Sequence, residues 1–422
     1  MTRNVLCLFY YFPPSGGAGS LRCLATARHL LDHGWRATVV APRGAHYHTS
    51  GEDLLASIPA GIEVHRTACL DLKRPLGMLR RLGISPETLT RMERTFLLPD
   101  PQVGWMPFAW EASRRLLAQR RFDAVLSWGA PWTAHLLGAH LARAHGIPFV
   151  AAFADEWSGN AILRDLPAPL RALHRRWEGR VLARASAVTA TTERMRQALR
   201  EAHPGLDPRI ELVDNGYEED DFRGRTGRRA ERFTLLTAGS HYSRTSAEVL
   251  LDVLQALLAR RGAWRGELRL RVLGLHDPAL AQGVLRRGLT DVVSLEGPRP
   301  HAEAVQAMLD AHALALTLTG EDNVPSVHPV RLFEYLRTGL PVLAFCPQGE
   351  TSDLLAGFPD CVRLAPGDAD LASRTLEAWI SRWKDGTWPP PAASREGLPA
   401  FSRAAQVARL AALLDKVAGV RP

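Results

Sequence analysis

The sequence predicts an α/β protein made of two successive series of alternating strands and helices. The chain has 422 residues, which is too long for one ordinary core and suits two domains of about 200 residues each. In both halves, short apolar runs typical of buried strands alternate with longer helical segments, as in a doubly wound parallel sheet. In both halves the first strand also runs through a glycine turn into a helix, which is the opening unit of such sheets.

Composition sets the broad class of the protein. Hydrophobic residues make up 46% and charged residues 23% of the chain, as in globular proteins, and the net charge of +8 suits acidic ligands such as nucleotides or phospholipid headgroups. No nucleic-acid motif accompanies this charge. The five cysteines form no C-x-x-C pair, so we expect buried thiols. The chain opens on a strand and contains no apolar run of about 18 residues, so we expect a cytoplasmic protein.

The first half contains a glycine-rich loop directly after its first strand. We expect strands at residues 5–10, 37–41, 123–127, 148–153, 187–191 and 210–213, and helices at 20–33, 131–145 and 169–183. The loop at residues 12–19 includes Gly16, Gly17 and Gly19. Its glycines allow the backbone to approach a ligand closely, although a tight turn alone would also require them. The spacing is not that of a dinucleotide fingerprint.

Asp155 follows the predicted strand at residues 148–153. Ligands of open α/β sheets bind beyond the carboxyl ends of the strands, where an acid can meet a substrate hydroxyl. The alternative is that Asp155 forms an Asx turn or caps a helix.

A basic and partly apolar segment spans residues 70–98. Such a segment could lie on an anionic bilayer surface. A solvated helix that packs on its own domain is the competing interpretation, and the sequence favours it.

In the second half, a glycine turn again follows the first strand. We expect strands at residues 233–238, 268–273, 292–295, 313–318 and 342–345, and a helix at 246–260. Gly239 and Ser240 open a loop before that helix, as in phosphate-facing loops, and Arg244 is the nearby cation. Arg244 could instead be an ordinary solvent-facing arginine. His301 precedes the next helix, where it could contact a ligand or act as a helix cap.

The stretch at residues 328–342 is the most informative part of the chain. Pro329 suits the start of a helix, an apolar stripe follows, and Gly339 with Pro341 ends the helix. Glu334 lies among apolar neighbours, where a carboxylate is costly unless a hydrogen bond satisfies it. The helix N-terminus is also a natural anion site. The alternative places Glu334 on the solvated face of a surface helix.

This stretch and the loop at residues 12–19 resemble the motifs of family 4 retaining glycosyltransferases. The resemblance implies the GT-B fold: two facing Rossmann-like domains, with a C-terminal helix that crosses back to the first. It implies that Glu334 holds the nucleotide ribose, and that Gly16, Gly17 and Gly19 lie near the donor. By the same resemblance, Asp155 and Arg244 would be catalytic. The donor-binding set would also include Gly239, Ser240, His301, Val305, Ser326, Pro329 and Arg331.

The chain departs from the family pattern at three places. Ser326 stands where the family usually has the first of two glutamates, and Arg331 replaces a lysine. Around Asp155, the last acid and the tryptophan of the family motif are present, but its first acid and its arginine are not. These departures leave the donor sugar and the acceptor open.

The resemblance implies domains at residues 1–218 and 219–401, with a returning helix at 402–422. The first would bind the acceptor and the second the nucleotide sugar. Such enzymes transfer a sugar to a hydroxyl with retention and need no metal, and the sequence has no convincing ligand set for one. A lipid-linked saccharide of cell-surface polysaccharide synthesis is the expected acceptor, with possible peripheral contact at the inner membrane face and no nucleic-acid partner.

Three other activities remain open. A nucleotide-sugar 2-epimerase shares the two-domain shape but needs no acceptor. A catalytically inactive binding homologue is favoured by Ser326. A dinucleotide oxidoreductase fits least, because neither half carries the proper fingerprint.

Overall fold

The computed structural model describes residues 2–43, 51–72, 78, 83–206, 209–241, 246–318 and 324–419. The chain forms two compact units. Unit 1 contains Met1–Asn215 and Arg403–Pro422, and unit 2 contains Gly216–Ser402. The division after Asn215 lies close to the boundary that we predicted at residue 218.

Unit 1 is built on a parallel sheet of seven strands in the order β3-β2-β1-β4-β5-β6-β7. The strands are β1 Arg3–Leu8, β2 Trp35–Pro42, β3 Glu63–Thr67, β4 Ala124–Gly129, β5 Phe149–Phe153, β6 Ala187–Ala190 and β7 Ile210–Leu212. The strand order reverses between β1 and β4. At this point the loops after the two strands diverge to opposite faces of the sheet, which leaves room for a ligand.

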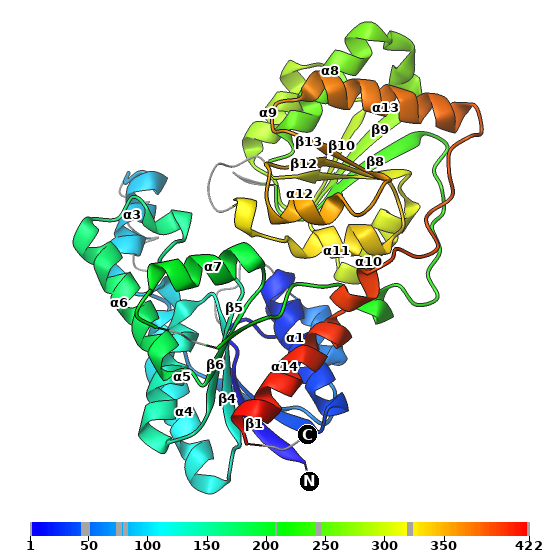
Figure 1. Ribbon diagram of the computed structural model, residues 1–422. Helices are drawn as coiled ribbons and strands as arrows, with labels where there is room; N and C mark the ends of the chain where they lie inside the picture. Colours follow the sequence, from blue (N-terminus) through cyan, green and yellow to red (C-terminus); the bar gives the residue numbers. More distant parts are fainter. Residues whose placement is uncertain are drawn as a thin grey trace. The chain divides into compact units, whose positions relative to one another are not determined.

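Helices cover both faces of this sheet (Figure 1). They are α1 Gly17–Asp32, α3 Pro86–Phe96, α4 Met106–Gln119, α5 Trp132–His145, α6 Ala168–Arg184, α7 Glu193–Ala202 and α14 Arg403–Val417, with 3-10 turns η1 Glu52–Ser57, η3 Pro101–Trp105 and η4 Ala161–Leu163. The apolar side chains of α1 and α14 pack on one face, and those of α4 to α7 pack on the other.

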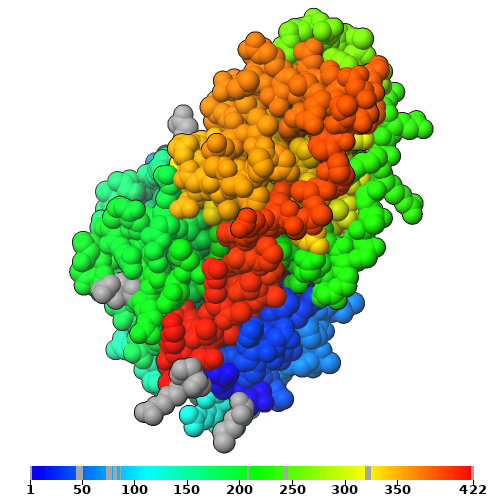
Figure 2. All heavy atoms as spheres, turned by 45° about the vertical axis from the view of Figure 1, so that its right-hand side comes forward, coloured from blue at the N-terminus to red at the C-terminus, as the bar shows by residue number. Residues whose placement is uncertain are grey.

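The C-terminal helix returns to unit 1, as predicted. Helix α14 buries Val407, Leu410 and Leu414 in the same apolar cluster as the first strands. The indole Nε1 of Trp35 donates a hydrogen bond to Asp415 Oδ1 at 2.8 Å. Figure 2 shows this helix in red, lying along the blue N-terminal part of the chain.

Unit 2 contains a parallel sheet of six strands in the order β10-β9-β8-β11-β12-β13. The strands are β8 Phe233–Ala238, β9 Leu268–Leu273, β10 Val293–Glu296, β11 Ala313–Thr317, β12 Val342–Phe345 and β13 Cys361–Leu364. The helices are α8 Glu248–Arg260, α9 Pro278–Arg286, α10 His301–Asp310, α11 Val330–Arg337, α12 Glu350–Leu355 and α13 Ala369–Lys384, with 3-10 turns η5 Glu219–Asp221, η7 Gly262–Gly266, η8 Val324–Ser326 and η9 Leu398–Phe401. Helices α10, α11 and α12 pack on one face, and α8, α9 and α13 on the other. The predicted α/β class with two Rossmann-like units is confirmed.

The segment at residues 70–98 is partly described. Its basic residues Lys73, Arg74, Arg80 and Arg81 lie outside the described residues. Helix α3 is present, and none of its described side chains is buried. Within the described ranges, no helix is both long and apolar enough to cross a bilayer.

The packing of α14 gives a test of the fold. Leu410 has no exposed surface, so Leu410→Ala should lower the free energy of unfolding by about 2–5 kcal/mol through lost burial and a cavity. Leu371 on α13 is 50% exposed, and Leu371→Ala should cost less than about 0.5 kcal/mol. Urea unfolding followed by tryptophan fluorescence measures both. Equal effects of the two changes would mean that α14 is not docked.

Candidate functional site

The strand order of unit 2 reverses between β8 and β11. In open α/β sheets, ligands bind at the carboxyl ends of the two strands that flank such a reversal. The two strands pair through Leu235 and Leu236 of β8, before its carboxyl end is reached. The backbone of the last residue of β8, Ala238, therefore needs hydrogen-bond partners from elsewhere on this side.

Helix α11 supplies these partners. Arg331 Nη1 donates to the carbonyl oxygen of Ala238 at 2.7 Å, and the backbone N–H of Ala238 donates to the hydroxyl of Tyr335, also at 2.7 Å. Arg331 and Tyr335 lie four residues apart, on the same side of the helix. Both polar groups of one strand residue are thus bonded to α11, which fixes the helix against the end of the sheet.

Gly239 is required by this contact. Its φ of +119° lies in the left-handed region, and a Cβ atom there would lie 2.9 Å from Arg331 Nη1. The carbonyl oxygen of Gly239 would in turn lie 2.0 Å from a Cβ atom on Gly274, whose φ is +117°. Gly239 and Gly274 thus directly follow the adjacent carboxyl ends of β8 and β9. Neither residue has a side chain that could cover the backbone there. Ser240 follows on the exposed side.

Glu334 lies inside the structure rather than on a solvated face. The residue is 7% exposed. The Nε2 atom of His301 lies 3.8 Å from Glu334 Oε1, beyond hydrogen-bond distance. His301 is the first residue of α10, and its Nε2 lies 2.8 Å from Asp221 Oδ2. Because the carboxylate of Glu334 accepts no hydrogen bond from a described residue, it can accept one from a ligand hydroxyl.

The loop before α11 is held by α12. The side-chain hydroxyl of Thr351 donates to the carbonyl oxygen of Val327 at 2.7 Å. A Cβ atom on Gly349 would lie 2.4 Å from the carbonyl oxygen of Pro325, so only glycine permits this approach. The held loop contains Ser326, which is half-buried.

The N-terminus of α11 carries positive potential. Pro329 is its N-cap, and no side chain caps the helix. The first N–H groups of α11 and the positive end of its dipole are therefore available to bind an anion. Arg331 adds a full charge, and burial lowers its pKa while Tyr335 and Glu334 oppose this effect. The arrangement offers donors for an anion and, one turn further, a carboxylate for a hydroxyl.

Two predicted donor residues fall outside this group. Val305 has no exposed surface and packs in the apolar core of unit 2, so its side chain has no surface for a ligand. Helical spacing did not reveal the burial of Val305, because a residue at this position of α10 could face either the core or the solvent. Arg244 lies outside the described residues.

In unit 1, the glycine loop follows β1 at the reversal of strand order. Gly16 is the N-cap of α1 and provides no side-chain cap, and Gly17 has a φ of +82°. A Cβ atom on Gly19 would lie 3.3 Å from the ring of Tyr11. The loop thus leaves the N-terminus of α1 open at the point where the sheet accepts ligands.

Asp155 is half-buried just beyond β5, and its charge acts on Arg22 of α1. Burial lowers the pKa of Arg22, and Asp155 is the largest opposing influence. Arg22 Nε donates to Asn215 Oδ1 at 3.0 Å, and its guanidinium lies over the ring of Trp128 at 5.3 Å. The charge of Asp155 thus acts on Arg22, without a direct ion pair between the two side chains.

The sequence interpretation missed Arg22, Asn215, Asp221 and Tyr335. Arg22 lies early in the helix that follows the glycine loop, and Asn215 belongs to an Asn-Gly pair, which in a sequence indicates no more than a turn. Asp221 lies in a strongly charged segment of the kind that is usually solvated. Among the described residues, no group of three or more histidine, cysteine, aspartate or glutamate side chains could hold a metal ion.

Comparison with known proteins shows one family model and several solved structures that resemble this chain. The family model of Glycosyltransferase Family 4 matches residues 16–221. Sucrose-phosphate synthase from Thermosynechococcus elongatus aligns over 98% of this chain and 99% of its own, with a TM-score of 0.68 and 14% identity. Anabaena Alr3699/HepE in complex with UDP-glucose aligns over 98% of this chain and 99% of its own, with a TM-score of 0.64 and 17% identity.

Trehalose 6-phosphate synthase from Burkholderia multivorans aligns over 99% of both chains, with a TM-score of 0.66 and 13% identity. The fold is that of the GT-B glycosyltransferases. The family 4 match begins in the glycine loop of this GT-B chain and ends at Asp221, beside His301. No curated protein matches the chain in sequence.

The joint between β8 and α11 can be tested at Gly239. Gly239→Ala should lower the free energy of unfolding by about 1–3 kcal/mol, because the left-handed backbone is strained and the new Cβ atom displaces Arg331. Gly262→Ala is the matched control, since a Cβ atom there meets nothing within 4 Å. Thermal and urea unfolding measure both. If Gly239→Ala leaves the free energy of unfolding unchanged, the contact between Gly239 and Arg331 is not tight.

Proposed function

We propose that this chain transfers a sugar from a nucleoside diphosphate sugar to a hydroxyl group of an acceptor. The observation that carries the proposal is the buried carboxylate of Glu334, which accepts no hydrogen bond from a described residue and lies one turn from an uncapped helix N-terminus at the strand reversal of unit 2. A nucleoside diphosphate has the matching chemistry, since it joins a pyrophosphate to a ribose with hydroxyl groups. Glu334 would accept a hydrogen bond from the ribose, and His301 beside it would line the nucleoside.

The diphosphate would lie against the N-terminus of α11. The N–H groups there and the guanidinium of Arg331 stabilise negative charge, which grows on the diphosphate as the sugar departs. Gly239 and Ser240 would bring open backbone and a hydroxyl to the same anion. Arg244 is proposed as a second cation. This chemistry requires no metal ion, because helix dipole and arginine provide the charge.

Unit 1 would bind the acceptor. Asp155, with Arg22 as its counter-charge, would orient the acceptor hydroxyl or receive its proton. The glycine loop with Gly16, Gly17 and Gly19 would allow close approach of the donor to the backbone.

The ligands of a protein with the same fold support a nucleotide sugar as donor. Alr3699/HepE was solved with UDP, with UDP and glucose, and with UDP-glucose. WaaG, a glycosyltransferase involved in lipopolysaccharide biosynthesis, and TarM have the same fold, with TM-scores of 0.59 and 0.67. We propose a lipid-linked saccharide of surface-polysaccharide synthesis as acceptor, peripheral contact with the inner membrane face, and retention at the anomeric carbon.

Ser326 favours one alternative, an inactive homologue that binds nucleotide but does not transfer sugar. A nucleotide-sugar 2-epimerase is the other. Incubation with a nucleotide sugar separates them: the epimerase converts it without acceptor, and the inactive homologue leaves it unchanged with or without acceptor.

The proposal predicts binding of a nucleoside diphosphate. In a thermal-shift screen of UDP, GDP, ADP, CDP and dTDP, at least one should stabilise the protein, by roughly 2.7 kcal/mol at about 100 times its Kd. The corresponding nucleosides, which lack phosphate, are the control and should give a much smaller shift. If none of the diphosphates shifts the transition, unit 2 is not a nucleotide site.

Glu334 should act on donor binding. Glu334→Ala should raise the donor KM about 30-fold, through loss of a charge-assisted hydrogen bond of about 2 kcal/mol. Glu303→Ala, on the exposed side of α10, is the control and should leave KM unchanged. Steady-state kinetics with varied donor measure both variants. An unaltered KM in Glu334→Ala would refute the assignment of the ribose to this residue.

A further inference from the structure

Helix α6 of unit 1 has an unusual charge distribution. It contains five arginines, Arg171, Arg175, Arg176, Arg180 and Arg184, and all five are exposed. The only acid between Asp165 and Glu193 in the sequence is Glu178. Glu178 is 1% exposed and accepts hydrogen bonds inside the unit, from the backbone N–H of Ser158 at 3.2 Å and from His203, whose Nε2 lies 2.9 Å away. Its charge therefore does not neutralise the surface.

The outer arginines form a row. Arg176, Arg180 and Arg184 are spaced by four residues, so they lie on one side of the helix, where like charges repel one another. Among the described residues, Arg176 and Arg180 have no hydrogen bond or ion pair, and Arg184 donates only to the carbonyl oxygen of Ala142. The exposed neighbours Ala172 and Ala183 are small, which leaves the guanidinium groups free to reach a flat surface.

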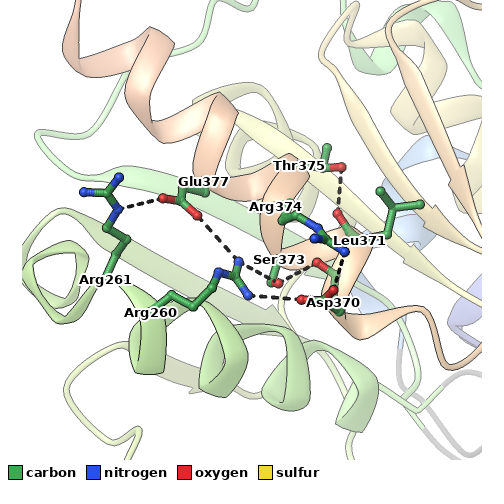
Figure 3. Close-up of polar contacts among 8 residues, drawn as sticks. All are labelled: Arg260, Arg261, Asp370, Leu371, Ser373, Arg374, Thr375 and Glu377. Atoms are coloured by element: carbon green, nitrogen blue, oxygen red, sulfur yellow. Dashed lines mark hydrogen bonds and ion pairs between the residues drawn. The ribbon is translucent and has the colours of Figure 1, made fainter.

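A group of arginines at helices α8 and α13 of unit 2 is arranged differently. On helices α8 and α13, each arginine in Figure 3 meets a carboxylate. Arg260 Nη1 lies 3.2 Å from Asp370 Oδ1, Arg261 Nε lies 2.9 Å from Glu377 Oε1, and Arg374 pairs with Asp370. These three arginines are thus neutralised locally, unlike the row on α6.

An exposed apolar side chain lies at the N-terminal end of α6. Ile162 in η4 is 45% exposed. The turn that follows is held to the helix, because Arg171 Nη1 donates to the carbonyl oxygens of Leu166 at 2.7 Å and Arg164 at 3.2 Å. Exposed apolar side chains and arginines are both found at bilayer interfaces, where apolar groups enter and cations meet phosphates.

We propose that this face of α6, with Arg176, Arg180 and Arg184, docks on the anionic headgroups of a phospholipid bilayer. The proposal rests on the proposed function, since a lipid-linked acceptor lies in a membrane. It gives the peripheral contact a defined surface on unit 1. Nucleic acid fits this surface less well, because no exposed aromatic side chain for base stacking accompanies the arginines.

Vesicle sedimentation of the full chain, without donor or acceptor, tests the proposal. The wild type should bind vesicles of phosphatidylcholine mixed with phosphatidylglycerol, should bind pure phosphatidylcholine weakly, and should dissociate as salt is raised. The double variant Arg176→Gln, Arg180→Gln should lower the partition coefficient by roughly tenfold or more. The control Arg261→Gln, Arg374→Gln removes the same charge from unit 2 and should bind as the wild type does.

Three results would overturn the docking surface: equal binding of the α6 variant and the wild type, no preference for phosphatidylglycerol, or displacement of the wild type from vesicles by a short single-stranded RNA at low concentration. Circular dichroism and the nucleotide thermal shift of each variant are measured in parallel. If the nucleotide shift persists while vesicle binding is absent, the docking surface fails and the proposed function stands. If vesicle binding persists without a nucleotide shift, the docking surface stands and the proposed function fails.

Discussion

The candidate site depends on the joint between the end of β8 and helix α11. At the strand reversal of the unit 2 sheet, Ala238 cannot complete its hydrogen bonds within the sheet, and Arg331 and Tyr335 complete them from the helix. This contact is possible only because Gly239 and Gly274 have no side chains. It fixes the rotation of α11, and that rotation turns Glu334 inward beside His301.

Further contacts fix the C-terminal end of α11. Arg395 donates from Nη1 to the carbonyl oxygen of Leu336 at 2.9 Å and from Nη2 to that of Leu340 at 2.8 Å, which places a cation at the negative end of the helix. Gly339 has a φ of +71°, and a Cβ atom there would lie 2.3 Å from the carbonyl oxygen of Ala392. A helix of eight residues is too short to be stable alone, so these tertiary contacts determine its position.

Much of the fold could be predicted from the sequence, because buried parallel strands are apolar runs and glycine turns separate them from helices. β3 at Glu63–Thr67 was missed, since it reads Glu-Val-His-Arg-Thr and lies at the edge of its sheet, where half-exposed side chains are polar. The apolar neighbours of Glu334 left open whether its side chain is buried or solvated, and the structure buries it. The hydrogen bond between Arg22 and Asn215 could not be predicted from the sequence. It joins residues almost two hundred positions apart, so it depends on the tertiary packing of α1 within unit 1. Asp221 was missed because it lies in a strongly charged segment, where side chains are usually solvated.

The central claim is that Glu334 binds the ribose of a nucleoside diphosphate whose phosphates meet the N-terminus of α11. A crystal structure with the diphosphate that stabilises the protein most tests it directly. The account predicts a ribose hydroxyl within about 3 Å of a Glu334 carboxylate oxygen, and phosphate oxygens on the first N–H groups of α11 and on Arg331. Density for the nucleotide elsewhere in the molecule, or a ribose that does not reach Glu334, would contradict it.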